Sequence, residues 1–162
     1  MKIGILSDTH GNLPATLGAV EAFRAAGVSA IFHCGDIGAF EVLEKLSVLR
    51  VPVHAVLGNV DAYADAWRFA PDRQGINLHG TFGDIALAGY RIALLHGDDA
   101  RRFDQAVASR DFDFVFSGHS HEFHDYAVGE TRCINPGTAG RGTPCTCAVL
   151  DPGSGTLQKV RI

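Results

Sequence analysis

The sequence predicts a protein of the α/β class, and two patterns support this prediction. In the first half of the chain, short runs of consecutive apolar residues alternate with segments whose apolar residues recur at helical spacing. Apolar runs of strand length separated by amphipathic helices are typical of a parallel sheet that helices cover on its faces. In the second half most apolar runs are separated only by turn residues, which indicates antiparallel pairing.

Three strands and two helices are expected in the first half. The run over residues 2–7 has the length of a strand, and Asn12 and Pro14 are typical of an N-cap followed by the first turn of a helix. The helical spacing continues to Gly27, a residue type that commonly ends helices. The other predicted elements are strands over residues 30–34 and 52–57 and a helix over residues 40–49.

The second half begins with a less regular segment that holds Trp67, Phe69 and Pro71. The two aromatic residues belong either to the core or to a subunit contact, and the sequence leaves both alternatives open. Gly89 then separates two apolar runs, which predicts a hairpin. The predicted elements are the hairpin strands over residues 84–88 and 90–95, a helix over 103–109, and strands over 112–117, 123–128, 131–135, 145–151 and 157–162.

The composition excludes several classes of protein. With 162 residues, of which 46% are hydrophobic and 20% are charged, the chain is expected to form a single domain over residues 1–162 with a sizeable core. Its formal net charge is −4, and Lys and Arg form no long run. Non-specific nucleic-acid binding requires a clustered basic surface, so we do not expect it here.

The N-terminal sequence and the cysteines indicate a cytoplasmic protein without a membrane segment. The apolar run over residues 3–6 is too short for a secretory signal or a membrane span. The cysteines form no CxxC pair, so we interpret them as reduced residues rather than zinc ligands. They are Cys34, Cys133, Cys145 and Cys147.

Polar side chains follow five of the predicted strands in the same way. Each apolar run gives way to a small residue and then to an Asp, Asn or His. Because ligands bind at the carboxyl ends of the strands in open α/β sheets, we expect these side chains to meet at one edge. The set consists of Asp8, His10, Asp36, Asn59, His96, His119 and His121.

This set has the composition of a metal site. Carboxylates, a carboxamide oxygen and neutral imidazoles bind divalent Mn, Fe, Ni and Zn, and seven ligands exceed what one ion needs. Residues two apart on an extended segment face the same side, so Asp8 and His10 can converge on one cavity, as can His119 and His121. A two-metal site requires a bridging carboxylate, and Asp36 is the natural candidate. A single Asp or His at a strand end is usually a capping or surface residue. That explanation does not account for five strands that all end in the same pattern.

The order D-x-H, G-D, G-N-x-D/E, H and G-H-x-H resembles the pattern of the calcineurin-like metallophosphoesterase superfamily. The run Asn135-Pro136-Gly137-Thr138 is similar to the N-P-G-S/T segment of its small single-domain bacterial and archaeal phosphodiesterases. The resemblance spans about residues 1 to 151. It implies a four-layer αββα sandwich of two mixed β-sheets flanked by helices, with the active site at the C-terminal ends of the strands.

The resemblance also implies a metal centre and a reaction. Two divalent ions are implied per chain, with manganese the expected metal and nickel, iron and zinc as alternatives. The implied function is hydrolysis of phosphodiester bonds by attack of a metal-bridging hydroxide. Alternatives with the same site are a phosphomonoesterase, a nucleotide pyrophosphohydrolase and a non-catalytic metal-binding scaffold protein. The implied ligands are Asp8, His10, Asp36 and His121 for the first metal, and Asp36, Asn59, His96 and His119 for the second; Asp36, Asn59, His119 and Asp61 are the implied catalytic residues.

One position departs from the superfamily pattern. Larger relatives have His as the third residue of G-N-H-D/E, where it is thought to help protonate the leaving group, whereas this chain has Val60. Valine carries no proton, so esters whose leaving oxygen departs easily are expected to be favoured. Asp61 either orients His119 or caps a turn. The implied partner is a small phosphoester, including nucleotide-type diesters; small relatives are often dimers or larger, so a homo-oligomer is also implied.

Three further residues have two interpretations each. We interpret His33 as a hydrogen-bonded buried histidine rather than as part of the cavity wall. His124 lies either at the rim of the site or on the surface of an edge strand. Arg141 follows the Asn-Pro-Gly-Thr turn and either binds a phosphate oxygen or is solvated.

Overall fold

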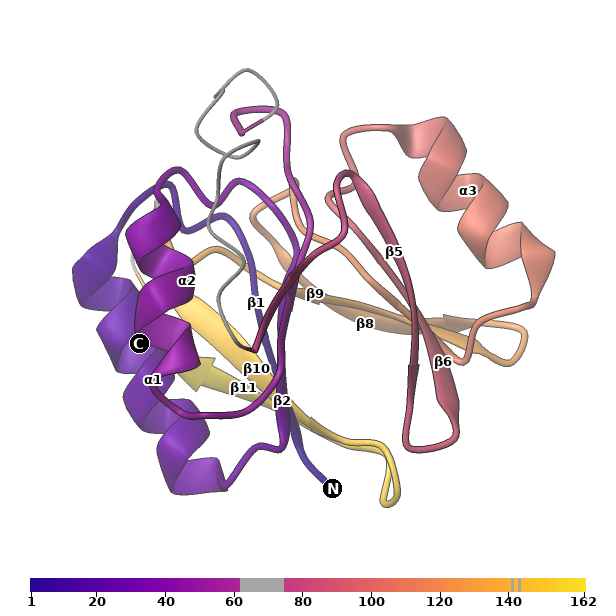
Figure 1. Cartoon of the computed structure of the whole chain (residues 1–162). Helices are drawn as coiled ribbons and strands as arrows, with labels where there is room; N and C mark the ends of the chain where they lie inside the picture. Colours follow the sequence, from indigo (N-terminus) through magenta and orange to yellow (C-terminus); the bar gives the residue numbers. More distant parts are fainter. Residues whose placement is uncertain (62–74, 141, 143) are drawn as a thin grey trace.

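Two β-sheets pack face to face in the computed structural model, which describes residues 1–61, 75–140, 142 and 144–162 (Figure 1). Two helices cover the outer face of the first sheet, and one helix lies on the outer face of the second. The layers follow the order helix, sheet, sheet, helix, which confirms the predicted four-layer αββα sandwich. The predicted irregular segment with Trp67, Phe69 and Pro71 lies outside the described residues, as does Arg141.

The first sheet consists mainly of the N-terminal half of the chain. Its strands are β1 (Ile3–Leu6), β2 (Ala30–His33), β3 (Val53–Ala55), β4 (Ile76–Leu78), β10 (Thr146–Asp151) and β11 (Thr156–Arg161). Their spatial order is β11-β10-β1-β2-β3-β4. The strands from β1 to β4 pair in parallel, whereas β10 pairs antiparallel with both β1 and β11. The parallel part matches the prediction from the alternating apolar runs.

The second sheet differs in one respect from the antiparallel pairing expected of this half. Its strands are β5 (Phe82–Leu87), β6 (Tyr90–Leu95), β7 (Phe114–Phe116), β8 (Phe123–Val128) and β9 (Thr131–Pro136), in the order β5-β6-β7-β9-β8. β5 with β6 and β8 with β9 form antiparallel hairpins, but β7 pairs in parallel with both β6 and β9. A helix crosses between β6 and β7, and this type of connection brings two strands into parallel register. Both sheets are therefore mixed.

Three helices cover the sheets, and capping residues account for most of their ends. They are α1 (Leu13–Ala26), α2 (Phe40–Ser47) and α3 (Ala100–Ser109). The Asn12 side chain accepts a hydrogen bond from the Ala15 N–H, and Gly27 ends α1 with φ at 67°. α3 begins earlier than predicted because the Asp99 carboxylate accepts the Arg102 N–H. No helix in the described part of the chain combines the length and the apolar character needed to cross a bilayer.

β4 was not predicted from the sequence. It is three residues long, and a strand of this length is too short to display a period. Its pairing is set by β3, because Val53 aligns with Ile76 and Ala55 aligns with Leu78. The apolar side chains of Ile76 and Leu78 pack against the cluster beneath the helices.

The central core lies between the two sheets. It contains Ile3, Ile5 and Phe32 from the first sheet and Leu94 and Phe116 from the second, among other buried apolar residues. The rings of Phe32 and Phe116 meet edge to face with centroids 5.2 Å apart. Packing between the sheets therefore fixes the position of the strand ends of one sheet relative to those of the other.

His33, the last residue of β2, is a fully buried polar group in this frame. Its Nδ1 accepts the Gly35 N–H at 3.2 Å, so Nε2 carries the proton and donates to Thr9 Oγ1 at 2.9 Å. The Thr9 hydroxyl in turn donates to the carbonyl of Ile37 at 2.9 Å. His33 is thus the hydrogen-bonded buried histidine that was expected, and it ties the loop after β1 to the loop after β2.

Burial lowers the pKa of His33 to about 3, which predicts a loss of stability in mild acid. Between pH 6.5 and 3 the unfolded chain binds a proton at this histidine and the folded chain does not, so stability falls as the pH falls. At pH 5 this amounts to about 2 kcal/mol. In urea titrations of metal-free protein, His33→Gln should show a smaller fall in unfolding free energy between pH 7 and pH 5 than the wild type. The exposed His124→Gln is the control, and equal slopes in all three proteins would contradict the assignment.

Candidate metal centre

The loops that follow five strands meet where the carboxyl ends of the two sheets come together. Backbone hydrogen bonds connect these loops directly. The Asp8 N–H donates to the Gly35 carbonyl at 3.0 Å, and the Gly118 N–H donates to the His96 carbonyl at 2.8 Å. Residues distant in the sequence are held at one edge in this way, as the pattern of strand ends predicts.

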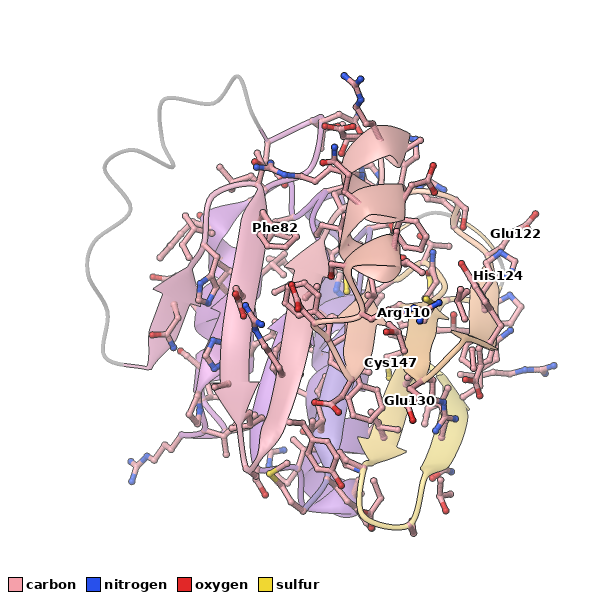
Figure 2. The ribbon with its side chains drawn as sticks, turned by 90° about the vertical axis from the view of Figure 1, so that its right-hand side faces the viewer. Phe82, Arg110, Glu122, His124, Glu130 and Cys147 are labelled. Carbon is pink, nitrogen blue, oxygen red and sulfur yellow. The ribbon has the colours of Figure 1, made fainter. Side chains whose placement is uncertain are left out.

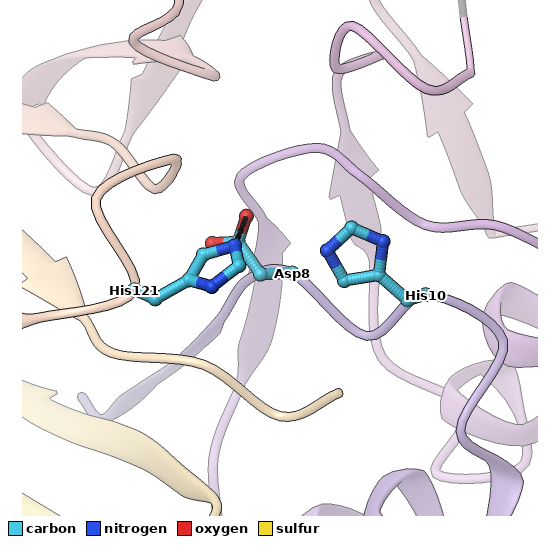
Figure 3. A group of neighbouring side chains, drawn as sticks. All are labelled: Asp8, His10 and His121. Atoms are coloured by element: carbon cyan, nitrogen blue, oxygen red, sulfur yellow. Dashed lines mark ion pairs between the residues drawn. The ribbon is translucent and has the colours of Figure 1, made fainter. Parts of the chain in front are cut away.

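Asp8, His10 and His121 form a first group of side chains (Figure 3). Their potential ligand atoms all lie within 4.8 Å of one another. His121 Nε2 is 3.2 Å from Asp8 Oδ1, and the rings of His10 and His121 meet edge to face at 5.6 Å. Two imidazoles and a carboxylate at this spacing can share one divalent ion.

Asp8 also belongs to a second group, together with Asp36 and His96. His96 Nε2 lies 3.3 Å from Asp36 Oδ1, 4.0 Å from Asp8 Oδ1 and 3.2 Å from Asn59 Oδ1. The other oxygen of Asp36, Oδ2, lies 3.7 Å from His10 Nε2. Asp36 thus presents one oxygen to each group, the arrangement that a bridging carboxylate requires.

His119 is placed less directly than the other six candidates. Its ring packs edge-on against the His96 ring, with centroids 5.1 Å apart, and its backbone N–H donates to Asp8 Oδ2 at 3.1 Å. Among the described residues it belongs to neither three-residue group. The structure therefore brings His119 to the centre through its backbone and through contact with His96.

The donor atoms fit a divalent cation. Asp8 Oδ1 and His10 Nε2 are buried, yet neither has a hydrogen-bond partner among the described residues. Leaving a buried polar atom unpaired is costly unless another ligand compensates for it. Nδ1 of His96 donates to the Cys34 carbonyl at 2.8 Å, which leaves the lone pair of Nε2 facing the carboxylates. The residues therefore present converging acceptor atoms without an internal cation.

Burial and neighbouring charges shift the pKa values of this centre. Burial raises the pKa of Asp8 above its ordinary value, in spite of the nearby imidazoles. Burial opposes protonation of His96, but the Asp36 carboxylate and the Cys34 carbonyl outweigh it and raise its pKa. For Asp36, burial is outweighed by His96 and the Val60 N–H, and its pKa is lowered. The two carboxylates thus favour a positive charge among these groups, as a divalent cation would supply.

The candidate ligands share an unusual backbone conformation. Of the non-glycine residues with positive φ in the described part of the chain, five are candidate ligands. Their φ angles are 55° at Asp8, 45° at His10, 51° at Asp36, 67° at His119 and 60° at His121. Such conformations cost about 1–3 kcal/mol each and are concentrated at functional sites. The loops are therefore strained at the residues that point into the centre.

The hydrogen bonds of Asp61 agree with the interpretation that it caps a turn rather than orients His119. Its Oδ2 accepts the N–H groups of Ile37 and Gly58, and its Oδ1 accepts that of Gly38, all at 2.9 Å. Backbone donors of two ligand loops thus occupy both oxygens, and the assignment of Asp61 as a catalytic residue stays a prediction. Asp61 positions the loop of Asp36 against the loop of Asn59.

Asn135 is a positioning residue whose role the sequence pattern alone did not reveal. Its amide donates to the Gly118 carbonyl at 2.7 Å and to Ser120 Oγ at 3.1 Å, while its oxygen accepts the Gly137 N–H. It thereby holds the loop that carries His119 and His121. The Asn-Pro-Gly run was the available signal, since Asn side chains commonly close turns on their own backbone.

Two other residues are placed by the structure. The Val60 side chain is exposed and, as expected, offers no proton, while its N–H donates to Asp36 Oδ1 at 3.1 Å. His124 lies on the exposed edge strand β8, where its Nε2 is 3.5 Å from Glu122 Oε2. This agrees with the edge-strand interpretation of His124.

The left-handed backbone at His121 predicts an unusual response to mutation. In metal-free protein, His121→Gly removes a conformational cost of about 1–2 kcal/mol, which should offset the entropy that glycine loses on folding. Urea denaturation should therefore give an unfolding free energy equal to or above the wild-type value, although metal binding is impaired. The control His124→Gly, in the extended strand β8, should lower it by about 1 kcal/mol. Equal losses in the two variants would show that the strain is not relieved.

Comparisons with known proteins agree with this geometry. A sequence profile described as the calcineurin-like phosphoesterase superfamily domain matches residues 1–155. A phosphodiesterase of Methanocaldococcus jannaschii is 31% identical over 138 residues, which cover 85% of this chain and 83% of that protein. A phosphodiesterase of Escherichia coli is 26% identical over 167 residues, which cover 93% of this chain and 88% of that protein.

A solved structure, described as a novel archaeal phosphodiesterase, has the same fold. It superposes with a TM-score of 0.87 at 28% identity and covers 100% of both chains. The family profile spans every candidate ligand, and the overall fold is that of the solved relative. The chain therefore belongs to the calcineurin-like phosphoesterase superfamily, a family of enzymes that hydrolyse phosphoric esters.

Proposed function

We propose that this protein is a dinuclear metal-dependent phosphodiesterase. The observation that carries the proposal is the pair of ligand groups that share Asp8, with the two oxygens of Asp36 directed to His96 and to His10. One ion would be held by Asp8, His10, Asp36 and His121, and a second by Asp36, Asn59, His96 and His119. Two carboxylates against two dications leave a net positive centre, which attracts an anionic ester despite the negative charge of the whole chain.

The residues of the chain have separate parts in this mechanism. When bound, two divalent ions make water a stronger acid at neutral pH and stabilise negative charge on phosphoryl oxygens. His96 is oriented by its Nδ1–H bond to the Cys34 carbonyl, and Asp61 fixes the Asp36 and Asn59 loops relative to each other. These residues bind and position the reacting groups.

Two considerations bear on the substrate: the names of the relatives favour diesters, and Val60 favours good leaving groups. The relatives from Methanocaldococcus jannaschii and Escherichia coli are named phosphodiesterases. In addition, the exposed Val60 side chain cannot donate a proton to a leaving oxygen. Without such a donor, hydrolysis depends on a leaving group that departs as a stable anion.

Mixed nitrogen and oxygen ligands without thiolate also suit manganese, with iron, nickel and zinc as alternatives.

We further infer that the protein acts in the cytoplasm as a single domain over residues 1–162. The free cysteines Cys34, Cys133 and Cys147, all buried, accord with a reducing compartment.

Metal reconstitution tests the proposal. Protein stripped with a chelator is assayed with bis(p-nitrophenyl) phosphate, with p-nitrophenyl phosphate and with a dinucleotide pyrophosphate, before and after Mn²⁺ is added. We expect diester hydrolysis to return as about two metal ions bind per chain. Preferred turnover of the monoester or the pyrophosphate would instead identify another reaction of the same site.

Asp36→Asn should abolish turnover and lower the metal content, because the amide cannot bridge two cations as a carboxylate does. Asp84→Asn makes the same chemical change at a surface carboxylate paired with Arg91 and should have no effect on either quantity. Metal content is measured by elemental analysis alongside the diester assay. Near-normal activity of Asp36→Asn would refute the dinuclear arrangement.

Val60→His should increase turnover of diesters with poor leaving groups and have little effect on those with good ones. The imidazole would supply the proton that valine lacks, and general-acid catalysis contributes about 10²–10⁴-fold where it operates. The measurement is the dependence of kcat on leaving-group pKa for aryl methyl phosphates, with Val60→Leu as the control. An unchanged slope in Val60→His would mean that a missing acid does not limit the reaction.

A further inference from the structure

A cavity of about 210 Å³ lies on the outer face of the second sheet, beside α3. α3 crosses this face and leaves the strand that carries His124 uncovered at its side (Figure 2). The cavity lies between the helix and this edge strand. The residues that matter here are Phe103, Ser117, His119, His124, Tyr126 and Cys133.

Aromatic side chains form part of the wall of the cavity. Phe103 comes from α3, while His124 and Tyr126 stand two residues apart on β8 and therefore face the same side of the sheet. The buried Cys133 of β9 lies opposite Tyr126 in the register of the hairpin. The Tyr126 side chain is nevertheless 46% exposed, so much of its ring is free to contact a ligand.

The cavity adjoins the metal centre at His119. The His119 residue lines the cavity, and its ring also packs against His96, which faces Asp36 and Asn59. Gly97 follows His96 and Gly118 precedes His119 in the sequence, and both glycines form part of the same wall. His119 is thus common to the cavity and the candidate metal centre, so the cavity lies beside the expected position of the phosphate.

The size and lining of the cavity define the group that fits. Pockets for drug-sized ligands measure about 300–1,000 Å³, so a volume of about 210 Å³ suits one ring system rather than a whole nucleotide. The Asn135 amide at the cavity wall is already hydrogen-bonded to Gly118 and Ser120, which leaves stacking on the aromatic walls as the main interaction.

We propose that this cavity binds a planar aromatic group on one arm of the phosphodiester substrate, stacked between Phe103 and Tyr126. This inference rests on the proposed function and specifies its substrate class: diesters with an aryl or nucleobase-bearing arm rather than two small alkyl arms. Phe103 and Tyr126 are specificity-determining residues, and neither takes part in the reaction.

The proposal is tested by comparing two phosphonate inhibitors that present the same phosphonate group to the metal centre. Benzylphosphonate and methylphosphonate present the same anion and differ only in the aromatic group. With Mn²⁺-loaded protein and bis(p-nitrophenyl) phosphate as substrate, benzylphosphonate should inhibit about tenfold more strongly, equivalent to about 1.4 kcal/mol. Tyr126→Ala should reduce this ratio to about one, whereas Tyr126→Phe should retain it.

Val128→Ala is the matched control. Val128 lies two residues beyond Tyr126 on the same face of β8 and is equally exposed at 46%, but it does not line the cavity. Val128→Ala should retain the wild-type ratio of inhibition by benzylphosphonate to inhibition by methylphosphonate. Equal inhibition by the two phosphonates in the wild type, or an unchanged ratio in Tyr126→Ala, would overturn the proposal.

Direct binding separates a failure of the cavity from a failure of the proposed function. Saturation-transfer NMR on metal-free protein needs no turnover, and phenol and thymidine represent the aryl and nucleobase sources of the aromatic group. Transfer to either probe in the wild type, lost in Tyr126→Ala and kept in Val128→Ala, supports the cavity even if no ester is hydrolysed. The probe that binds identifies the source of the aromatic group. If neither probe shows saturation transfer, the proposal is overturned.

Discussion

The buried carboxylate of Asp8 constrains the arrangement of every loop around it. One oxygen accepts the N–H of His119, and the other faces His121 and His96 without a hydrogen-bond partner among the described residues. The Asp8 carbonyl also accepts the Thr138 hydroxyl. A charge buried between two sheets is tolerated only when it is compensated, so loops from both sheets have to converge on this residue.

This convergence requires backbone geometry that an unstrained chain avoids. The left-handed conformations at Asp8, His10, Asp36, His119 and His121 direct the side chains inward at a cost in conformational energy. The hydrogen bonds of His33, Asp61 and Asn135 hold these conformations, because each of the three connects one strand-end loop to another segment or back to itself. The strained loops are thus supported by hydrogen bonds around them, a combination that favours an external ligand over collapse of the loops.

Much of the fold and most of the candidate ligands follow from the sequence, because the relevant signals are local. Apolar runs that end in Asp, Asn or His indicated both the parallel strands and the edge where their side chains meet. β4 escaped prediction because its pairing depends on β3, and the parallel placement of β7 depends on the crossover of α3. The role of Asp61 was left open for the same reason: its partners, Ile37 and Gly38, come from another strand's loop. The aromatic cavity arises only when α3 and β8 are brought together in space.

The distribution of the ligands over two sheets has a consequence for how the protein acquires metal during folding. Asp8, His10, Asp36 and Asn59 follow strands of the first sheet, whereas His96, His119 and His121 follow strands of the second, and Asp8 lies 111 residues from its backbone partner His119. A chain in which only the first sheet has formed contains the carboxylates but lacks three of the imidazoles. Selective capture of metal therefore follows the docking of the sheets, and metal binding then opposes their separation.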